Sequence, residues 1–183
     1  MAHADLNKIL VVDLEATCWE PKFEQGDQIS EIIEIGACLL DVKTGAITNK
    51  TSYLIRPTHS TLSKFCIGLT SITPELLKTD GIPFQDAVNK MSKEFGVNKT
   101  WASWGNYDQR KFREDCAFKN VPYPFKQTHI NAKNLFALRK GMAREVGLAE
   151  AVRICGFEFE GQHHRGHNDA FMAAKVLWEI IKR

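Results

Sequence analysis

Residues 8–16 read KILVVDLEA, a short apolar run that ends with two acidic residues, Asp13 and Glu15. The run predicts a buried β-strand, in which residues two positions apart point to the same face, about 6–7 Å apart. Two carboxylates on one face of such a strand are costly to bury unless a cation compensates them. Mg²⁺ and Mn²⁺ prefer oxygen ligands and suit this pair. The alternative is that the strand has already ended and both acids face water.

The segments on either side of this run predict the rest of one sheet. Residues 28–42 are long and β-branched, and residues 47–57 alternate in polarity and stop at Pro57. A turn at 41–45 indicates that these two strands are antiparallel. Short strands are also predicted over 100–105 and 127–132.

Helical periodicity dominates the second half of the chain. One short helix is predicted to begin at Thr73-Pro74. The other predicted helices cover 83–96, 107–120, the stretch from 132 through Lys140, 148–156 and 167–183. A three-stranded meander followed by alternating strands and helices predicts an α/β fold, a mixed five-stranded sheet with helices on both faces. Without a repeat or an obvious linker, residues 1–183 are expected to form a single domain, with its core at about 8–180.

Composition limits the classes of protein that the chain can represent. The chain has 183 residues, of which 44% are apolar, enough for one sizeable core. It lacks a run of about 18 apolar residues and a signal-peptide pattern, so no membrane association is expected. Five scattered cysteines without a paired spacing favour a reducing, cytoplasmic protein. The net charge of +2 is compatible with a polyanionic partner but does not require one.

Two further segments carry acids whose positions allow a structural or a chemical role. Asp108 follows the strand at 100–105 and lies near the start of a helix, where the helix dipole alone would favour an acid. Asp169 lies on the helical stripe of Met172 and Val176 and therefore faces the core, unless it caps the helix. His164 precedes it in a polar, histidine-rich loop. Four carboxylates and a histidine are the components of a two-metal hydrolytic site.

Three motifs occur in a fixed order: VVDLEAT (11–17), SWGNYD (103–108) and His164-x4-Asp169 within HHRGHNDA (163–170). Together with EIIEIGA (31–37) and LTSITPELL (69–77), they resemble the DEDDh family of 3′–5′ exonucleases, which share an RNase H-like fold. DLEATCW (13–19), LTSIT and residues 156–170 are most similar to the KapD-like branch. That branch includes exonucleases that act on histone mRNA and small-RNA 3′ ends.

The resemblance implies a role for each matching residue and two divalent cations, Mg²⁺ or Mn²⁺, as cofactors. Asp13 would bridge both metals, and Glu15 would bind the first metal and contact the 3′ end of the nucleotide. Asp108 would hold the second metal and Asp169 the first, while His164 would act as the base. The KapD-like branch usually has an apolar residue where this chain has His167, so a surface role and a contact with the site are both open for His167.

The implied partner is the 3′ end of a single-stranded nucleic acid, RNA or DNA. Such strands are bound by aromatic stacking and by cations along the backbone. The candidate substrate contacts are Ala16, Trp19, Phe23, Phe65 and Arg165, although each aromatic residue could equally be a packing residue. His163 is expected to be a surface or packing residue.

Two other functions fit the same sequence. One is a proofreading subunit bound to a polymerase, and the other is a non-catalytic module that binds nucleic acid or protein on the same fold. The choice between RNA and DNA, the physiological substrate, the preferred metal and the oligomeric state are left open by the sequence.

Overall fold

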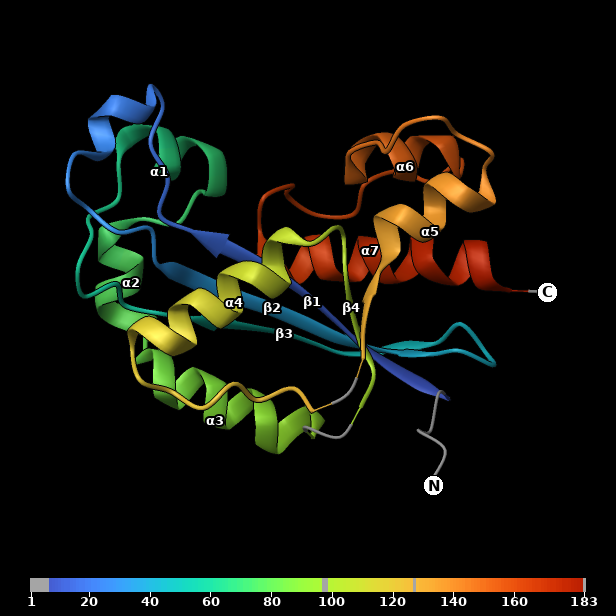
Figure 1. Cartoon of the computed structure of the whole chain (residues 1–183), viewed down its shortest axis with the longest axis horizontal. Coiled ribbons are helices and arrows are strands. Elements are labelled where there is room, and N and C mark those ends of the chain that lie inside the picture. The colour runs from blue at the N-terminus through green and yellow to red at the C-terminus, as the bar shows by residue number, and fades with distance from the viewer. Residues whose placement is uncertain (1–6, 97–98, 127, 183) are drawn as a thin grey trace.

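A computed structural model describes residues 7–96, 99–126 and 128–182 of the chain. Its five-stranded sheet has the order β3-β2-β1-β4-β5, so the segment KILVVDLEA forms the central strand (Figure 1). β2 is antiparallel to both β1 and β3, whereas β4 is parallel to both β1 and β5. The predicted mixed sheet is therefore confirmed. The strands are β1 (Lys8–Ala16), β2 (Ile32–Asp41), β3 (Ile47–Leu54), β4 (Trp101–Ser103) and β5 (His129–Asn131).

Most strands are shorter than predicted. The prediction of a strand over 28–42 is wrong at its start, because the strand begins only at Ile32. The buried carboxylate of Glu31 instead accepts hydrogen bonds from the amides of Thr58 and His59, at 2.9 and 2.7 Å, and joins two loops. The segments predicted over 47–57, 100–105 and 127–132 shorten to the bounds given above, and Gln127 lies outside the described residues.

The helices follow the prediction closely, except that η1 and α1 were not predicted. Thr73 caps α2 through its side chain, and Pro74 occupies the first turn, as expected. Helix α1 was not predicted, because Gly68 in its interior weakens the helical signal. It begins where the Ser63 hydroxyl accepts a hydrogen bond from the Cys66 amide. The helices are η1 (Lys22–Gln25), α1 (Lys64–Thr70), α2 (Pro74–Asp80), α3 (Phe84–Phe95), α4 (Tyr107–Phe118), α5 (Ala132–Arg139), α6 (Leu148–Ile154) and α7 (Gly166–Ile181).

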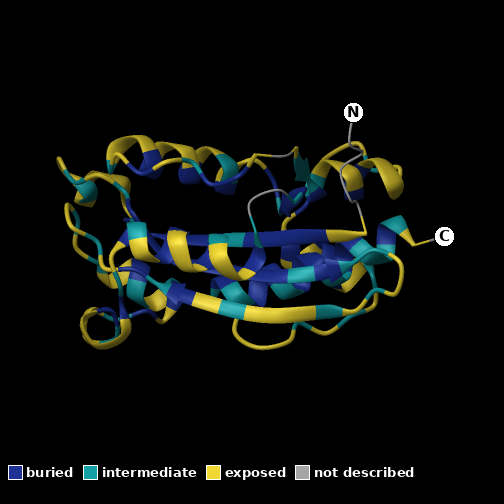
Figure 2. Cartoon of the chain, turned by 90° about the horizontal axis from the view of Figure 1, so that it is seen from below, coloured by how far each residue is buried: buried dark blue, intermediate teal, exposed yellow. Residues whose placement is uncertain are grey.

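The sheet is covered on both faces, and β1 divides its side chains between them. Ile9 and Val11 pack in one cluster with the buried side of α7, whereas Leu10, Val12 and Leu14 pack in another with α3 and α4. Figure 2 shows a buried strand in the middle of the molecule, a largely exposed strand at the edge of the sheet, and helices whose outer sides are exposed. Because side chains alternate along a strand, Asp13 and Glu15 continue the stripe that faces α7. Among the described helices, none is long and apolar enough to cross a membrane.

The start of α7 lies almost in contact with β2. A Cβ atom built on Gly36 would stand 1.8 Å from the carbonyl carbon of Gly166, too close for any side chain. Gly36 is the register partner of Asp13 on β1, and a Cβ on Gly166 would be 3.1 Å from the Asp13 carbonyl oxygen. Two glycines therefore set the distance between the first turn of α7 and the carboxyl end of β1.

We predict that Gly36→Ala strongly destabilises the fold, because α7 must move away from the sheet to accommodate the methyl group. Overpacking of this kind costs about 1–3 kcal/mol or more. Urea unfolding followed by circular dichroism measures the change. Gly68→Ala in α1 is the matched control, because a Cβ at this position would have nothing within 4 Å. This variant is expected to leave the stability of the fold unchanged or to increase it by about 0.5–1 kcal/mol. Equal stability of the two variants would contradict the close contact.

Candidate active site

The four predicted acids converge on one cavity at the carboxyl end of β1. One carboxylate oxygen from each of Asp13, Glu15 and Asp169 lies within 4.8 Å of the other two. The fourth acid, Asp108, comes from the first turn of α4. The cavity has a volume of about 300 Å³ and is lined by Asp13, Leu14, Glu15, Ala16, Cys18, Leu69, Trp104, Tyr107, Asp108, His164 and Asp169.

Asp108 is fixed to the central strand by the backbone. Its carboxylate accepts a hydrogen bond from the amide of Leu14, with 3.0 Å between nitrogen and oxygen. The Leu14 side chain lies on the opposite face of β1 from Asp13 and Glu15. The contact therefore attaches the start of α4 to β1 between the two acids. The simple reading of Asp108 as an acid that only stabilises a helix start does not explain this contact.

The site concentrates negative charge in a place with little water. Burial and then the neighbouring carboxylates raise the pKa of Asp13 well above its ordinary value and that of Glu15 to about 9. Burial also raises the pKa of Asp169 to about 7 and that of Asp108 to about 6. One oxygen of Asp169 is buried without a hydrogen-bond partner among the described residues. Such oxygen-rich clusters suit hard divalent cations, which supply the missing positive charge.

Glu34 shows that a buried acid in this protein does not always have a raised pKa. Its carboxylate is fully buried on β2 and accepts hydrogen bonds from Ser52, Arg165 and the Gly166 amide, at 2.6, 3.0 and 3.1 Å. It also lies 2.9 Å from the Nδ1 atom of His167. Although burial acts in the opposite direction, hydrogen bonds from His167, Arg165 and Ser52 lower the pKa of Glu34 to about 2. Glu34 is thus a charged structural acid, in contrast to Glu15.

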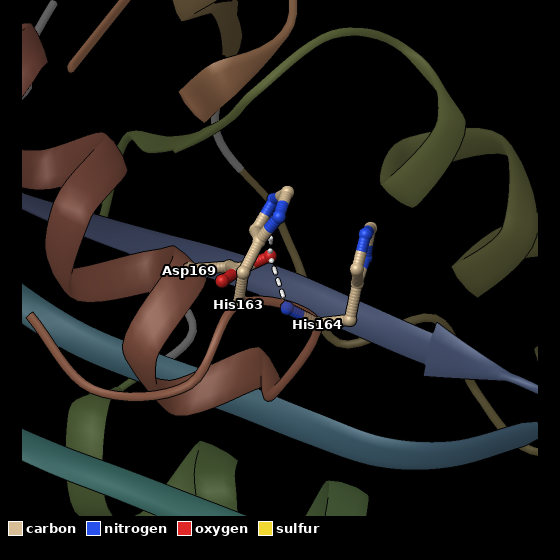
Figure 3. Close-up of side chains that lie close together, drawn as sticks. All are labelled: His163, His164 and Asp169. Carbon is tan, nitrogen blue, oxygen red and sulfur yellow. Dashed lines mark hydrogen bonds and ion pairs between the residues drawn. The ribbon is translucent and has the colours of Figure 1, made fainter. Parts of the chain in front are cut away.

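His164 lies on the loop before α7, and its imidazole lines the cavity (Figure 3). The loop bends sharply there, with a positive φ of 62° at His164. The bend lets the His164 amide donate to Asp169 Oδ2 at 3.2 Å, so Asp169 binds the loop backbone rather than capping α7. Burial lowers the pKa of His164 below its usual range, which favours the neutral imidazole that can accept a proton.

The two other histidines of this loop have different surroundings. His167 contacts Glu34 and does not line the cavity. His163 stacks on His164, with ring centroids 3.9 Å apart, and its Nε2 atom lies 3.5 Å from Asp169 Oδ2. His163 is thus partly exposed and packs on a neighbouring ring, as expected, and it also lies beside the carboxylate cluster.

The predicted substrate contacts are mostly placed elsewhere. Ala16 lines the cavity, but Trp19 is buried at 8% exposure and packs in the interior. Phe23 in η1 and Phe65 in α1 are exposed and do not line the cavity. Arg165 is paired with Glu34, so its guanidinium holds the loop on β2 instead of extending toward the cavity.

Several cavity residues were not singled out from the sequence. Trp104 and Tyr107 belong to the motif SWGNYD and flank the acid that it contains. Tyr107 is 46% exposed, which is large for an aromatic residue beside a buried carboxylate. Leu69 lies at the end of helix α1, which was not predicted. The sequence alone therefore did not place Leu69 at the cavity.

Comparison with known proteins identifies the family. A profile of the Exonuclease family matches residues 10–177. The probable 3′-5′ exonuclease KapD of Bacillus subtilis is 28% identical over 182 residues, which cover 97% of this chain and 85% of that protein. The 3′-5′ exoribonuclease 1 of Rattus norvegicus is 29% identical over 184 residues, which cover 95% of this chain but only 53% of that protein.

A solved structure shares the whole architecture. The nuclease domain of 3′hExo, described as a DEDDh family member bound to rAMP, superposes with a TM-score of 0.84 at 26% sequence identity. The match covers 96% of this chain and 92% of that domain. The RNase H-like fold predicted from the sequence is thereby confirmed.

The fold and the acidic cavity define a nuclease of the RNase H-like class. The chain belongs to the Exonuclease family. The predicted enzyme class, a DEDDh-type 3′–5′ exonuclease, is confirmed, as is the similarity to the KapD-like branch.

The raised pKa values predict how the metal-free protein responds to pH. A buried acid whose pKa is raised by folding favours the folded state when it is protonated, and this stability is lost as the pH rises through the raised value. For Asp108, Asp169 and Glu15 these values run from about 6 to about 9. The melting temperature in EDTA should therefore fall between pH 6.5 and 9, by about 2–4 °C for each kcal/mol lost.

Differential scanning fluorimetry with and without 5 mM Mg²⁺ provides the measurement. Added Mg²⁺ should restore the melting temperature most at pH 9, where the free cluster carries the most charge. Glu15→Gln removes one titrating acid and should flatten the curve in EDTA. A melting temperature that is independent of pH and of Mg²⁺ would show that the cluster neither titrates in this range nor binds the ion.

Proposed function

We propose that this protein removes nucleotides one at a time from the 3′ end of single-stranded RNA or DNA and releases nucleoside 5′-monophosphates. The observation that carries the proposal is the approach of three carboxylates, from Asp13, Glu15 and Asp169, to within 4.8 Å of one another. A group of like charges at this distance is strongly unfavourable without cations. Two Mg²⁺ or Mn²⁺ ions are the cofactors that fit these oxygen ligands.

Each acid has a distinct part in this proposal. Asp13 lies at the centre, on the same face of β1 as Glu15, and would bridge both ions. Glu15 and Asp169 would hold the first ion, and Glu15 would also contact the terminal nucleotide. Asp108, which lines the same cavity, would hold the second ion. When bound, the two ions would stabilise the negative charge that develops on the attacking and the leaving oxygen of the phosphodiester.

His164 would take the proton from the attacking water. It lines the same cavity as the four acids, and its lowered pKa keeps the imidazole neutral near pH 7. The hydrogen bond between its amide and Asp169 places the imidazole next to a proposed metal ligand. A general base should be within hydrogen-bond reach of the proton that it accepts, and this loop provides that position.

Single-stranded RNA is the first substrate to test. One similar structure contains a DEDDh nuclease with rAMP, and another, at 25% identity and a TM-score of 0.85, contains a 3′-exonuclease with a histone mRNA stem-loop. The exposed Tyr107 beside Asp108 offers a ring for stacking on a terminal base or sugar. The five free cysteines accord with the proposed cytoplasmic location.

The two alternative functions have weaker support. The convergence of all four acids with His164 on one cavity favours catalysis over a non-catalytic binding module. The similar proteins include 3′-5′ exoribonucleases, which favours RNA processing over a proofreading subunit of a polymerase.

The polarity and the metal requirement can be tested with Asp13→Asn as the inactive reference. Wild-type protein with Mg²⁺ or Mn²⁺ should shorten a 5′-labelled single-stranded RNA one nucleotide at a time, and EDTA should stop the reaction. A 3′-phosphate on the RNA should slow the reaction. The rate on a DNA of the same sequence measures the preference for ribose or deoxyribose. Asp13→Asn should abolish turnover, since a neutral amide is a poor bridging ligand, whereas the exposed Asp80→Asn should be fully active. Activity of Asp13→Asn at the wild-type level would disprove the two-metal site.

The role of His164 has a separate test. We predict that His164→Ala lowers kcat by roughly 10²–10⁴ while the affinity for Mn²⁺ is retained. His59→Gln, which replaces a histidine at the Glu31 loop, is the control and should keep wild-type turnover. Single-turnover degradation and Mn²⁺ titration by calorimetry measure the two properties. Unchanged kcat in His164→Ala would remove this residue from the reaction.

A further inference from the structure

His163, His164 and Asp169 form a second cluster that the proposed reaction does not fully use. One ligand atom from each of the three residues lies within 4.8 Å of the other two (Figure 3). We infer that this cluster is a separate, inhibitory binding site for Zn²⁺, which shares Asp169 with the carboxylate cluster. Its ligand set is two imidazoles and one carboxylate, whereas Asp13, Glu15 and Asp169 provide oxygen alone.

The ligand types distinguish the two sites chemically. Imidazole nitrogen suits Zn²⁺ and similar transition-metal ions, and Mg²⁺ prefers carboxylates and water. Three protein ligands with a fourth position open to solvent are typical of exchangeable Zn²⁺ sites. The side chain of His163 is 39% exposed, so the ion and a water ligand have access from solvent.

One of the ligand distances agrees with tetrahedral coordination. Zinc–nitrogen and zinc–oxygen bonds of about 2.0–2.2 Å place neighbouring ligand atoms about 3.3–3.6 Å apart in a tetrahedron. His163 Nε2 and Asp169 Oδ2 are already 3.5 Å apart. The ring of His164 stacks on that of His163 with centroids 3.9 Å apart, so an imidazole must turn before both rings direct a nitrogen at the same ion.

The loop that carries the two histidines is held in place by contacts outside the cluster. Arg165 and the Gly166 amide bind the buried carboxylate of Glu34, which fixes the chain directly after His164. The ring of Phe159 lies 4.9 Å from that of His163 on the other side. Preorganised ligands of this kind lose little conformational entropy when an ion binds.

Zinc bound here would stop the exonuclease reaction, a consequence that rests on the proposed function. It would occupy the imidazole of His164, the proposed base, and would draw Asp169 away from the Mg²⁺ site. Inhibition should then occur at Zn²⁺ concentrations far below that of Mg²⁺. His163 is the ligand that has no part in the proposed reaction, so its substitution separates inhibition from catalysis.

Zinc binding is measured first, because it needs no activity. Calorimetric titration of the metal-free, reduced protein with Zn²⁺ should give at least tenfold weaker binding at this site in His163→Gln and in His164→Gln than in the wild type. His59→Gln, which replaces a histidine outside the cluster, should bind like the wild type. Every variant keeps the five cysteines, so zinc held by thiols contributes equally to each titration. Equal Zn²⁺ affinity of the wild type and both cluster variants would overturn the site.

Inhibition is measured second, as degradation of labelled RNA at saturating Mg²⁺ with increasing Zn²⁺. Each protein is compared with its own rate without Zn²⁺, and the Zn²⁺ concentration for half inhibition should be at least tenfold higher for His163→Gln than for the wild type. The same half-inhibition concentration in both proteins would overturn the inhibitory role. If the wild type degrades no RNA, the proposed exonuclease function fails, while the calorimetric result still decides the zinc site.

Discussion

Unbalanced negative charge at the carboxyl end of β1 is the constraint on which the rest of this structure depends. Asp13 and Glu15 extend the buried stripe of Ile9 and Val11, so the pattern that forms the core also carries two carboxylates into it. The fold brings Asp169 to the same place, although each added charge makes the others less favourable. A protein can retain such a cluster only if it is neutralised by protons or by cations, and divalent ions do so at neutral pH.

Glu34, on the neighbouring strand β2, is also a buried acid, but hydrogen-bond donors of the protein stabilise its negative charge. It is as deeply buried as Glu15, yet it is surrounded by Ser52, Arg165 and His167, and its pKa is low while that of Glu15 is high. The donors come mainly from the loop that carries His164, so the charge of Glu34 is used to hold that loop. The positive groups near the site are thus bound to a structural acid, and the metal-facing acids are left for cations.

The sequence predicted the sheet and the four acids well, because strand periodicity and the spacing of the motifs are local properties. It placed the start of β2 too early, since the burial of Glu31 against another loop is a tertiary contact. Long-range contacts also decide where two side chains near the site lie. His163 lies beside Asp169, and Arg165 is captured by Glu34, because of how the loop folds back on β2. A linear pattern does not contain that information.

The contact between Gly36 and Gly166 links the stability of the fold to the geometry of the site. Gly36 pairs with Asp13 across β1 and β2, and Gly166 begins the helix that carries Asp169. Any side chain at either glycine would separate these two acids as well as the two elements. Close-packed interiors have low compressibility, so a displacement of the start of α7 would also displace Asp169. The same small residues therefore allow α7 to lie on the sheet and set how closely the two carboxylates approach each other.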